Sequence, residues 1–143
     1  MKTLVIFDSN FGNTKKIAEV IASELDAKAI SVSNFDKEEL EGVGLLIAGS
    51  PINGWRPTEK LSKILNNFSK TQLKGLKAVS FDTRANFFAS GNAAKKIAKK
   101  LENAGANIII EPQGFFVKGK EGPLLEGEIE KAKNWAREIK LKL

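Results

Sequence analysis

The chain is a succession of short apolar runs and amphipathic segments, and this alternation predicts strands that are each followed by a helix. The first run, Thr3–Phe7, is apolar without alternating polar positions, which is typical of a strand buried on both faces of a parallel sheet. After a polar loop, the apolar residues Ile17, Val20, Ile21 and Leu25 recur at helical spacing. The chain is therefore predicted to open with a strand, a tight loop and a helix.

The same pair of elements repeats along the chain. Further strands are predicted over 28–33, 44–51, 76–82 and 107–118, and further helices over 58–68, 93–103 and from 121 onward. Pro112 predicts a break in the last strand at a sheet edge, and Pro123 is expected in the first turn of the last helix. Five strands and about five helices, without repeats or linkers, predict one doubly wound, three-layered α/β domain over residues 1–143, with a five-stranded parallel sheet.

Polar and small residues fill the loop between the first strand and the first helix, from Asp8 to Thr14. At a helix start of this kind, the first backbone N–H groups lack intrahelical acceptors and carry partial positive charge. A phosphate group can be held there without a basic side chain. The loop is therefore predicted to bind an anion, although Gly12, Asn13 and Thr14 are also typical of an ordinary capped helix.

This loop resembles the phosphate loop of flavodoxins, which runs Thr/Ser-x-Thr-Gly-Asn-Thr, and the resemblance extends over nearly the whole chain. It implies a flavodoxin-like fold with strand order 2-1-3-4-5 and FMN as the cofactor, held above the carboxyl ends of the first and third strands. The loop residues implied to hold the FMN phosphate are Ser9, Asn10, Phe11, Gly12, Asn13 and Thr14. Phe11 departs from the family pattern, which usually has a second hydroxyl there, so one donor is lost.

The resemblance also implies that the loop after the third strand flanks the flavin ring, through Ser50, Pro51, Ile52, Asn53, Gly54 and Trp55. Trp55 is the candidate for stacking, because a flat indole can cover the ring and exclude water from it. The alternative is a loop anchor packed on the following helix. Gly54 can adopt a positive φ and let the Asn53–Gly54 peptide reorient toward the flavin N5. An ordinary Asn-Gly turn is the alternative.

The loop after the fourth strand is implied to cover the other face of the flavin and its pyrimidine edge. Thr83, Arg84 and Asn86 are the candidates to bond the polar edge of the ring, and Phe87 or Phe88 the candidate to stack, since the chain has no tyrosine. The two phenylalanines are equally compatible with a core or partner contact. A cation stabilises an anionic reduced flavin, so Arg84 is expected to raise the potential of the second reduction step relative to acidic relatives.

Composition excludes several kinds of chemistry. The chain has no cysteine and no histidine, which excludes disulfides, Cys/His metal sites and His-dependent triads. No metal site is predicted, and redox chemistry must come from a bound organic cofactor. The formal net charge of +6 is unusual beside flavodoxins, which are usually acidic. It is compatible with an acidic redox partner such as a reductase or ferredoxin, but the favoured interpretation is a solvated lysine-rich surface, because the lysines are spread over several helices. The lysines form no aromatic-interleaved stripe, so no nucleic-acid partner is expected. With no long apolar run or signal peptide, a cytoplasmic monomer without membrane contact is expected.

Four functions remain open on this basis. The first is a small FMN-binding electron carrier that is not itself an enzyme. The second is a phosphate-receiving signalling domain, suggested by Asp8, Thr83 and Lys118, but Gly49-Ser50 stands where such domains have an aspartate. The third is an FMN-dependent NAD(P)H:quinone-type oxidoreductase. The fourth is a protein of the same fold that binds FMN weakly or not at all and acts as a binding module.

Overall fold

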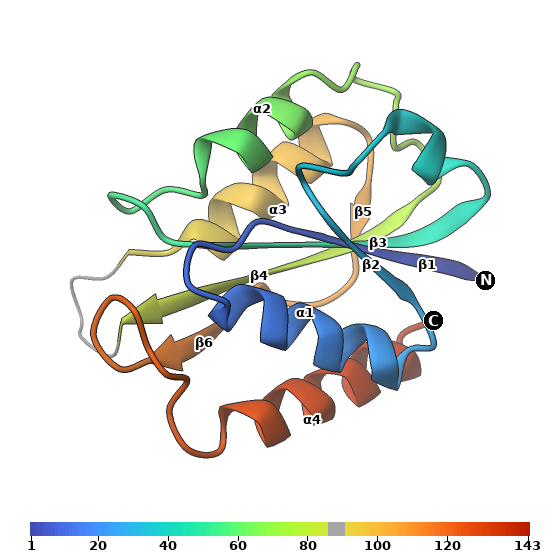
Figure 1. The fold of residues 1–143 in the computed structure, drawn as a ribbon. Coiled ribbons are helices and arrows are strands. Elements are labelled where there is room, and N and C mark those ends of the chain that lie inside the picture. Colours follow the sequence, from blue (N-terminus) through green and yellow to red (C-terminus); the bar gives the residue numbers. More distant parts are fainter. Residues whose placement is uncertain (86–90) are drawn as a thin grey trace.

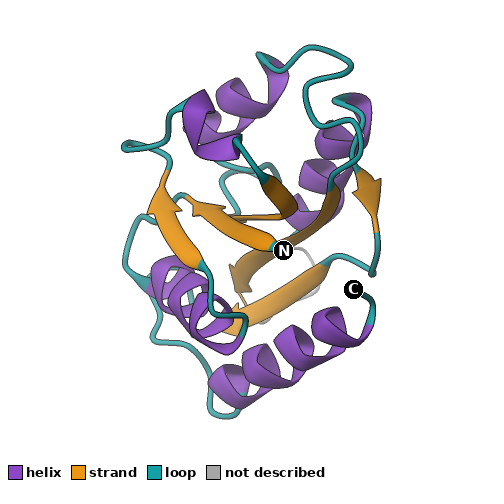
Figure 2. Ribbon diagram, turned by 90° about the vertical axis from the view of Figure 1, so that its right-hand side faces the viewer, coloured by secondary structure: helices purple, strands orange, loops and turns teal. Residues whose placement is uncertain are grey.

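The computed structural model describes residues 1–85 and 91–143. The strands are β1 (Lys2–Phe7), β2 (Lys28–Ser31), β3 (Val43–Pro51), β4 (Lys77–Ala85), β5 (Asn107–Ile108) and β6 (Gln113–Val117). The helices are α1 (Asn13–Glu24), α2 (Glu59–Asn66), α3 (Ala93–Asn103) and α4 (Glu128–Leu141), and η1 (Lys37–Leu40) is a short 3₁₀ helix. Helices α2 and α3 cover one face of the sheet and α1 and α4 the other (Figure 1, Figure 2). In the described part of the chain, no helix is long and apolar enough to cross a membrane.

The strands form one parallel sheet in the order β2-β1-β3-β4-β5, with β6 beside the carboxyl-terminal half of β4. The predicted order is confirmed, and so is the break in the last strand, because β5 and β6 lie on either side of Pro112 and both pair with β4. In the register, Phe7 lies beside Gly49, Gly49 beside Phe81, and Phe81 beside Gln113. The carboxyl ends of β1, β3, β4 and β6 therefore meet at one edge of the sheet.

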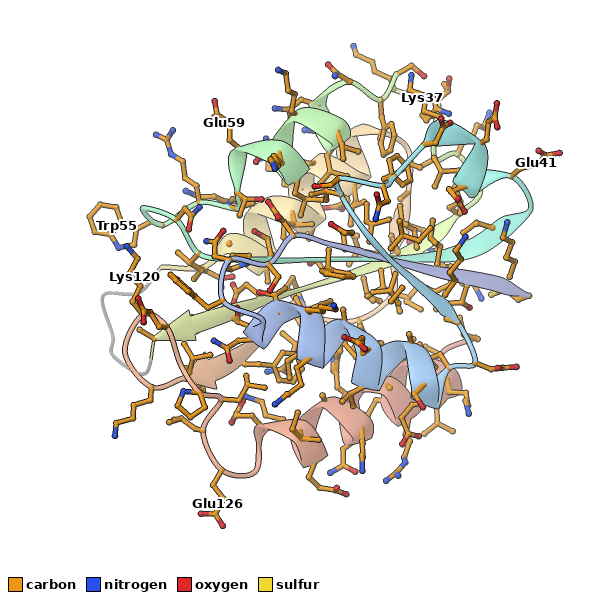
Figure 3. All side chains as sticks on the ribbon, in the orientation of Figure 1. Lys37, Glu41, Trp55, Glu59, Lys120 and Glu126 are labelled. Atoms are coloured by element: carbon orange, nitrogen blue, oxygen red, sulfur yellow. The ribbon has the colours of Figure 1, made fainter. Side chains whose placement is uncertain are left out.

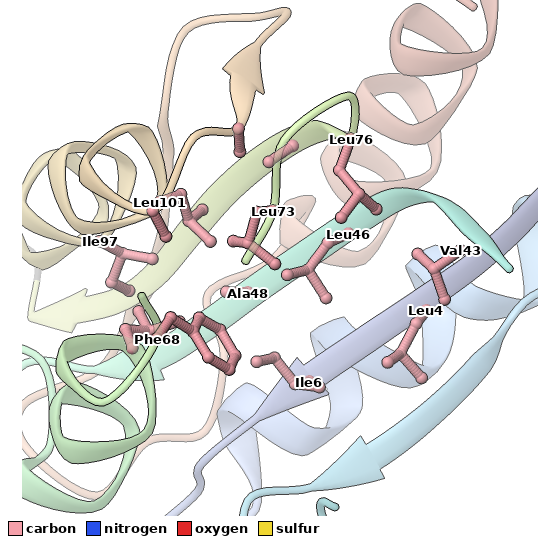
Figure 4. Packing of buried hydrophobic residues seen from close by; sticks show 14 of the residues in the cluster. Leu4, Ile6, Val43, Leu46, Ala48, Phe68, Leu73, Leu76, Ile97 and Leu101 are labelled. Carbon is pink, nitrogen blue, oxygen red and sulfur yellow. The ribbon is translucent and has the colours of Figure 1, made fainter. Parts of the chain in front are cut away.

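Alternate residues of β3 pack into two different cores, which explains why its sequence is apolar throughout. Leu46 and Ala48 belong to the core beneath α2 and α3, where Figure 4 shows them opposite Ile97. Leu45 and Ile47 belong to the core beneath α1 and α4. Burial on both faces makes the sheet a rigid base, and the loops at its edge are the parts exposed for binding.

The last helix begins later than predicted, at Glu128 rather than near Pro123. The intervening residues run back along β6, where the backbone N–H of Leu125 donates to the carbonyl oxygen of Phe116 at 2.9 Å. Gly127, at φ 88°, then turns the chain into α4. The expected count of about five helices was also wrong, because the described residues form four α-helices and the segment after β2 forms only η1.

Candidate functional site

A cavity of about 470 Å³ opens at the carboxyl edge of the sheet, between the end of β4 and the loops that follow β1, β3 and β6. This volume is within the range of small-molecule sites. The predicted site residues that line it are Asn10, Phe11, Asn13, Thr14, Pro51, Ile52, Asn53, Gly54, Trp55, Thr83 and Arg84. Ser9, Gly12 and Ser50 do not line the cavity. Asn86 and Phe87, like Phe88, lie outside the described residues.

The loop from Ser9 to Thr14 ends in the N-terminus of α1, whose cap residue Gly12 provides no side chain. The Ser9 hydroxyl acts in its place, accepting hydrogen bonds from the backbone N–H groups of Gly12 at 3.1 Å and Lys15 at 3.3 Å. The N–H groups of Asn13 and Thr14 have no acceptor among the described residues. These two donors stand at the positive end of the helix dipole, which makes the loop able to bind an anion.

The side chains of Thr14 and Asn13 connect this loop to other parts of the cavity wall. The Thr14 hydroxyl is buried and lies 2.8 Å from the Thr83 hydroxyl, so one of the two donates to the other. The Asn13 amide donates to the carbonyl oxygen of Glu121 at 2.8 Å, and Gly122 packs so closely on this amide that a Cβ there would lie 2.5 Å from its nitrogen. Asn13 therefore ties the loop after β1 to the loop after β6.

The loop after β3 is closed at its base by Ser50. The buried Ser50 hydroxyl accepts a hydrogen bond from the Thr58 backbone N–H at 2.8 Å and donates to the Pro51 carbonyl oxygen at 2.7 Å. Farther out, Asn53 and Arg56 exchange backbone hydrogen bonds of 2.8 and 3.1 Å across a two-residue turn. Ser50 thus holds the loop in shape, and the residues beyond it form the cavity wall.

The tip of this loop presents Trp55 at the cavity, with 62% of its surface exposed. Gly54 and Trp55 both have positive φ, 55° and 65°, and for tryptophan this left-handed conformation is strained by about 1 kcal/mol or more. A Cβ on Gly91 would lie 2.6 Å from the Trp55 Cδ1 atom, so only glycine allows Trp55 to sit where it does. Gly91 also has φ 87°, which favours glycine again. The sequence analysis did not single out Gly91; the Gly91-Asn92 pair before α3 was the available signal.

β4 continues three residues past its predicted end at Asp82, so Thr83 and Arg84 belong to the strand rather than to a loop. Asp82 and Arg84 are two residues apart and share one face of β4. The Arg84 guanidinium donates from Nε and Nη2 to the two carboxylate oxygens of Asp82, both at 2.7 Å. The Ala94 backbone N–H donates to the same carboxylate at 2.8 Å. The positive charge of Arg84 at the cavity is therefore compensated by a buried carboxylate.

Burial and the Arg84 charge have opposite effects on the pKa of the Asp82 carboxyl group. Asp82 is fully buried, and the loss of hydration raises its pKa above the usual range, while Arg84 and the backbone N–H groups of Ala93 and Ala94 lower it. Arg84 is further held by the Asn92 side chain at 3.2 Å and lies against Gly114, where a Cβ would come within 2.4 Å of its Nε. The pair fixes the end of β4, the start of β6 and the start of α3 relative to one another.

The fourth wall of the cavity was missed by the sequence analysis. It consists of Ala85, Val117, Gly119 and Lys120, three of them from the end of β6 and the loop that follows. The run Gly119-Lys120-Glu121-Gly122-Pro123 is dense in turn residues. Because all strands are parallel, the loop after the last strand must reach the same edge as the other three, and this was the signal that could have identified it.

The comparisons with known proteins agree with this architecture. The sequence model of a family described as flavodoxin matches residues 5–135. An uncharacterized protein of Methanocaldococcus jannaschii is 30% identical over 97% of this chain and 98% of its own length. The crystal structure of oxidised flavodoxin 1 from Bacillus cereus has a TM-score of 0.83 at 21% identity, covering 100% of this chain and 99% of that one. A flavodoxin from the domain Archaea has a TM-score of 0.82 at 21% identity, covering 99% and 98%.

Proposed function

Because the chain belongs to the flavodoxin family, we propose that it binds FMN in the cavity at the carboxyl edge of the sheet and carries single electrons between redox partners. The observation that carries the proposal is the pair of N–H groups of Asn13 and Thr14, which have no acceptor in the described part of the chain and belong to residues lining a cavity with an exposed tryptophan at its mouth. The anion site would bind the phosphate of the nucleotide, and the flat apolar surface would cover its ring.

The residues around the cavity fit each part of FMN. The start of α1 would hold the phosphate through backbone N–H groups, which do not require the hydroxyl that Phe11 replaces. The Asn10 amide donates to the Asn53 side chain at 3.2 Å, and these exposed amides are placed to bond polyol hydroxyls. Pro51, Ile52 and Trp55 supply apolar surface for the ring.

The chain's own part in electron transfer would be to bind, orient and shield the cofactor. FMN supplies the redox chemistry when it is bound. Trp55 would exclude water from one face of the ring. The base of the cavity is rigid because Ser50, Asp82 and Thr83 are buried and hydrogen-bonded. A rigid site reduces the reorganisation that accompanies a change of charge.

Titration of FMN with the purified protein tests the proposal, with quenching of flavin fluorescence as the readout. Riboflavin is the matched control, because it has the same ring and polyol but no phosphate. We expect saturable quenching of FMN at micromolar protein, and binding of riboflavin weaker by a factor of roughly 100, corresponding to one or two charge-assisted hydrogen bonds. No quenching up to a large excess would refute FMN binding, and equal affinity for the two ligands would refute the phosphate site. Rapid oxidation of NAD(P)H by the loaded protein alone would favour an oxidoreductase over a carrier.

A further inference from the structure

The exposed charges at the carboxyl edge of the sheet are mostly positive. The exposed cations on the loops and first helical turns at this edge are Lys15, Lys16, Arg56, Lys60, Lys95, Lys96, Lys118 and Lys120. The carboxylates there that are not buried are Asp8, Glu59, Glu121, Glu126 and Glu130. Residues 86–90, which the structure does not describe, contain no ionisable side chain. The end of the molecule that carries the cavity therefore has an excess of positive charge.

These cations, here called the basic rim, are not used in ion pairs within the described residues. The ion pairs nearest the cavity join Arg84 to Asp82 and Lys131 to Glu128, and neither involves a residue of the rim. At the opposite end, by contrast, Lys28 pairs with Glu39. Figure 3 shows the two ends, with Trp55 and Lys120 together at one and Lys37 and Glu41 at the other. The rim charges are thus available to a partner.

Exposed aromatic surface lies inside this rim. Phe11 and Trp55 line the cavity with 51% and 62% of their surfaces exposed, and the remaining exposed large apolar residues in the described part of the chain lie near its termini. Aromatic residues at the centre of a charged ring are the usual composition of a protein-binding surface, in which the centre supplies affinity and the rim supplies orientation. Trp55 also keeps its place at the mouth only because Gly91 lacks a side chain.

We infer that the mouth of the cavity is the docking surface for an acidic one-electron protein, whose carboxylates face Lys118, Lys120 and Arg56 while its apolar centre meets Phe11 and Trp55. The inference rests on the proposed function, since it gives the carrier its partner. Electron-transfer encounters bury little area, so the attraction between charged surfaces determines how often a productive complex forms. The positive mouth would attract acidic partners and repel basic ones.

Charge reversal at two matched places tests the surface. The variant Lys118→Glu/Lys120→Glu reverses two charges of the rim. Lys70→Glu/Lys74→Glu makes the same change in net charge at exposed positions of the loop before β4, at the opposite edge. Each protein is titrated calorimetrically with three probes, an acidic ferredoxin, a basic cytochrome c and a single-stranded oligonucleotide, with and without saturating FMN. The titrations are made at about 0.01 M and about 0.1 M ionic strength, where the Debye length falls from about 30 to about 10 Å.

We expect the unaltered chain to bind the acidic probe more tightly than the basic one, and to do so less tightly at the higher ionic strength. The rim variant should bind the acidic probe roughly tenfold more weakly, and the opposite-edge variant less than about threefold more weakly. Equal losses in the two variants, a preference for the basic probe, or tighter binding of a single-stranded oligonucleotide would overturn the inference. Binding is measured with and without FMN, so the two proposals can be refuted separately. If the chain does not bind FMN but prefers the acidic probe as expected, only the proposed cofactor is refuted. If it binds FMN but the rim variant binds the acidic probe as well as the unaltered chain does, only the docking surface is refuted.

Discussion

The Asp82–Arg84 pair can be tested by removing the guanidinium and keeping its aliphatic stem. Arg84→Met leaves the fully buried Asp82 carboxylate without its cation, and the methionine can still cover Gly114. Removing one partner of a buried pair costs about 3–5 kcal/mol. Here Asp82 keeps the N–H of Ala94, and the Arg84 side chain is 17% exposed. We therefore expect the free energy of unfolding to fall by about 2–3 kcal/mol at neutral pH.

The loss should depend on pH in a defined direction. Burial already holds the pKa of Asp82 above its usual range, and Arg84 opposes this effect, so without Arg84 the pKa rises further. In the variant, the native state then binds a proton that the unfolded state has released, and the free energy of unfolding rises as the pH falls through the raised native pKa. The difference from the unaltered protein is greatest at neutral pH and smaller at about pH 5.

Urea unfolding followed by circular dichroism at both pH values measures this effect. A loss of about 2–3 kcal/mol corresponds to a decrease of roughly 1–2 M in the urea midpoint at neutral pH. The double variant Asp82→Asn/Arg84→Met removes both charges and should recover more than half of the loss. Equal midpoints at neutral pH, a deficit that is the same at both pH values, or a double variant no more stable than the single one would each show that Arg84 does not balance a buried charge.

Three further predictions concern the cavity. Gly91→Ala places a Cβ 2.6 Å from the Trp55 Cδ1 atom at a φ of 87°, so it should displace the indole, change its fluorescence and weaken FMN binding roughly tenfold in a titration. Phe11→Thr introduces, at a half-exposed position, the hydroxyl that the family pattern usually has there, and this variant should bind FMN about tenfold more tightly than the control Phe11→Ala. Equal affinities of the two variants would show that the hydroxyl does not reach the phosphate. Thr14→Val leaves the buried Thr83 hydroxyl without its partner and should lower the free energy of unfolding in urea by about 1–2 kcal/mol. The double variant Thr14→Val/Thr83→Val should recover part of this loss, and additive losses would contradict the hydrogen bond between the two hydroxyls.

The fold could be predicted where local pattern and tertiary packing agree. The predicted bounds of α3 are the observed ones, because both ends of the helix carry local capping signals. At the start of the helix, the Asn92 side chain accepts a hydrogen bond from the Lys95 backbone N–H at 2.9 Å, and after the end of the helix Gly105 has a φ of 101°. The start of α4 could not be predicted in the same way. Pro123 is typical of a first helical turn, but the long-range bond from Leu125 to Phe116 holds that segment against β6. Local propensity does not contain this bond.

The site could be predicted loop by loop, but not the contacts between loops. Asn10 and Asn13 were interpreted as ligand contacts, and in the structure their amides also bind Asn53 and the loop after β6. Such contacts join residues far apart in sequence and have no periodic signature. The Asp82–Arg84 pair did have one, because side chains two residues apart on a strand share a face. The unpredicted length of β4 concealed it, since Arg84 had been placed in a loop.

The two cations at the cavity have different electrostatic effects, and this changes how the net charge of the chain bears on its function. Arg84 was expected to stabilise a reduced flavin, but Asp82 compensates its charge, so its field in the cavity is that of a dipole. Lys120 also lines the cavity and has no ion-pair partner among the described residues. A unit charge about 10 Å from a ligand at an effective dielectric constant of about 40 contributes on the order of 1 kcal/mol. The same lysine would therefore raise the reduction potential of bound FMN and attract an acidic partner, and both effects should weaken together as salt is added.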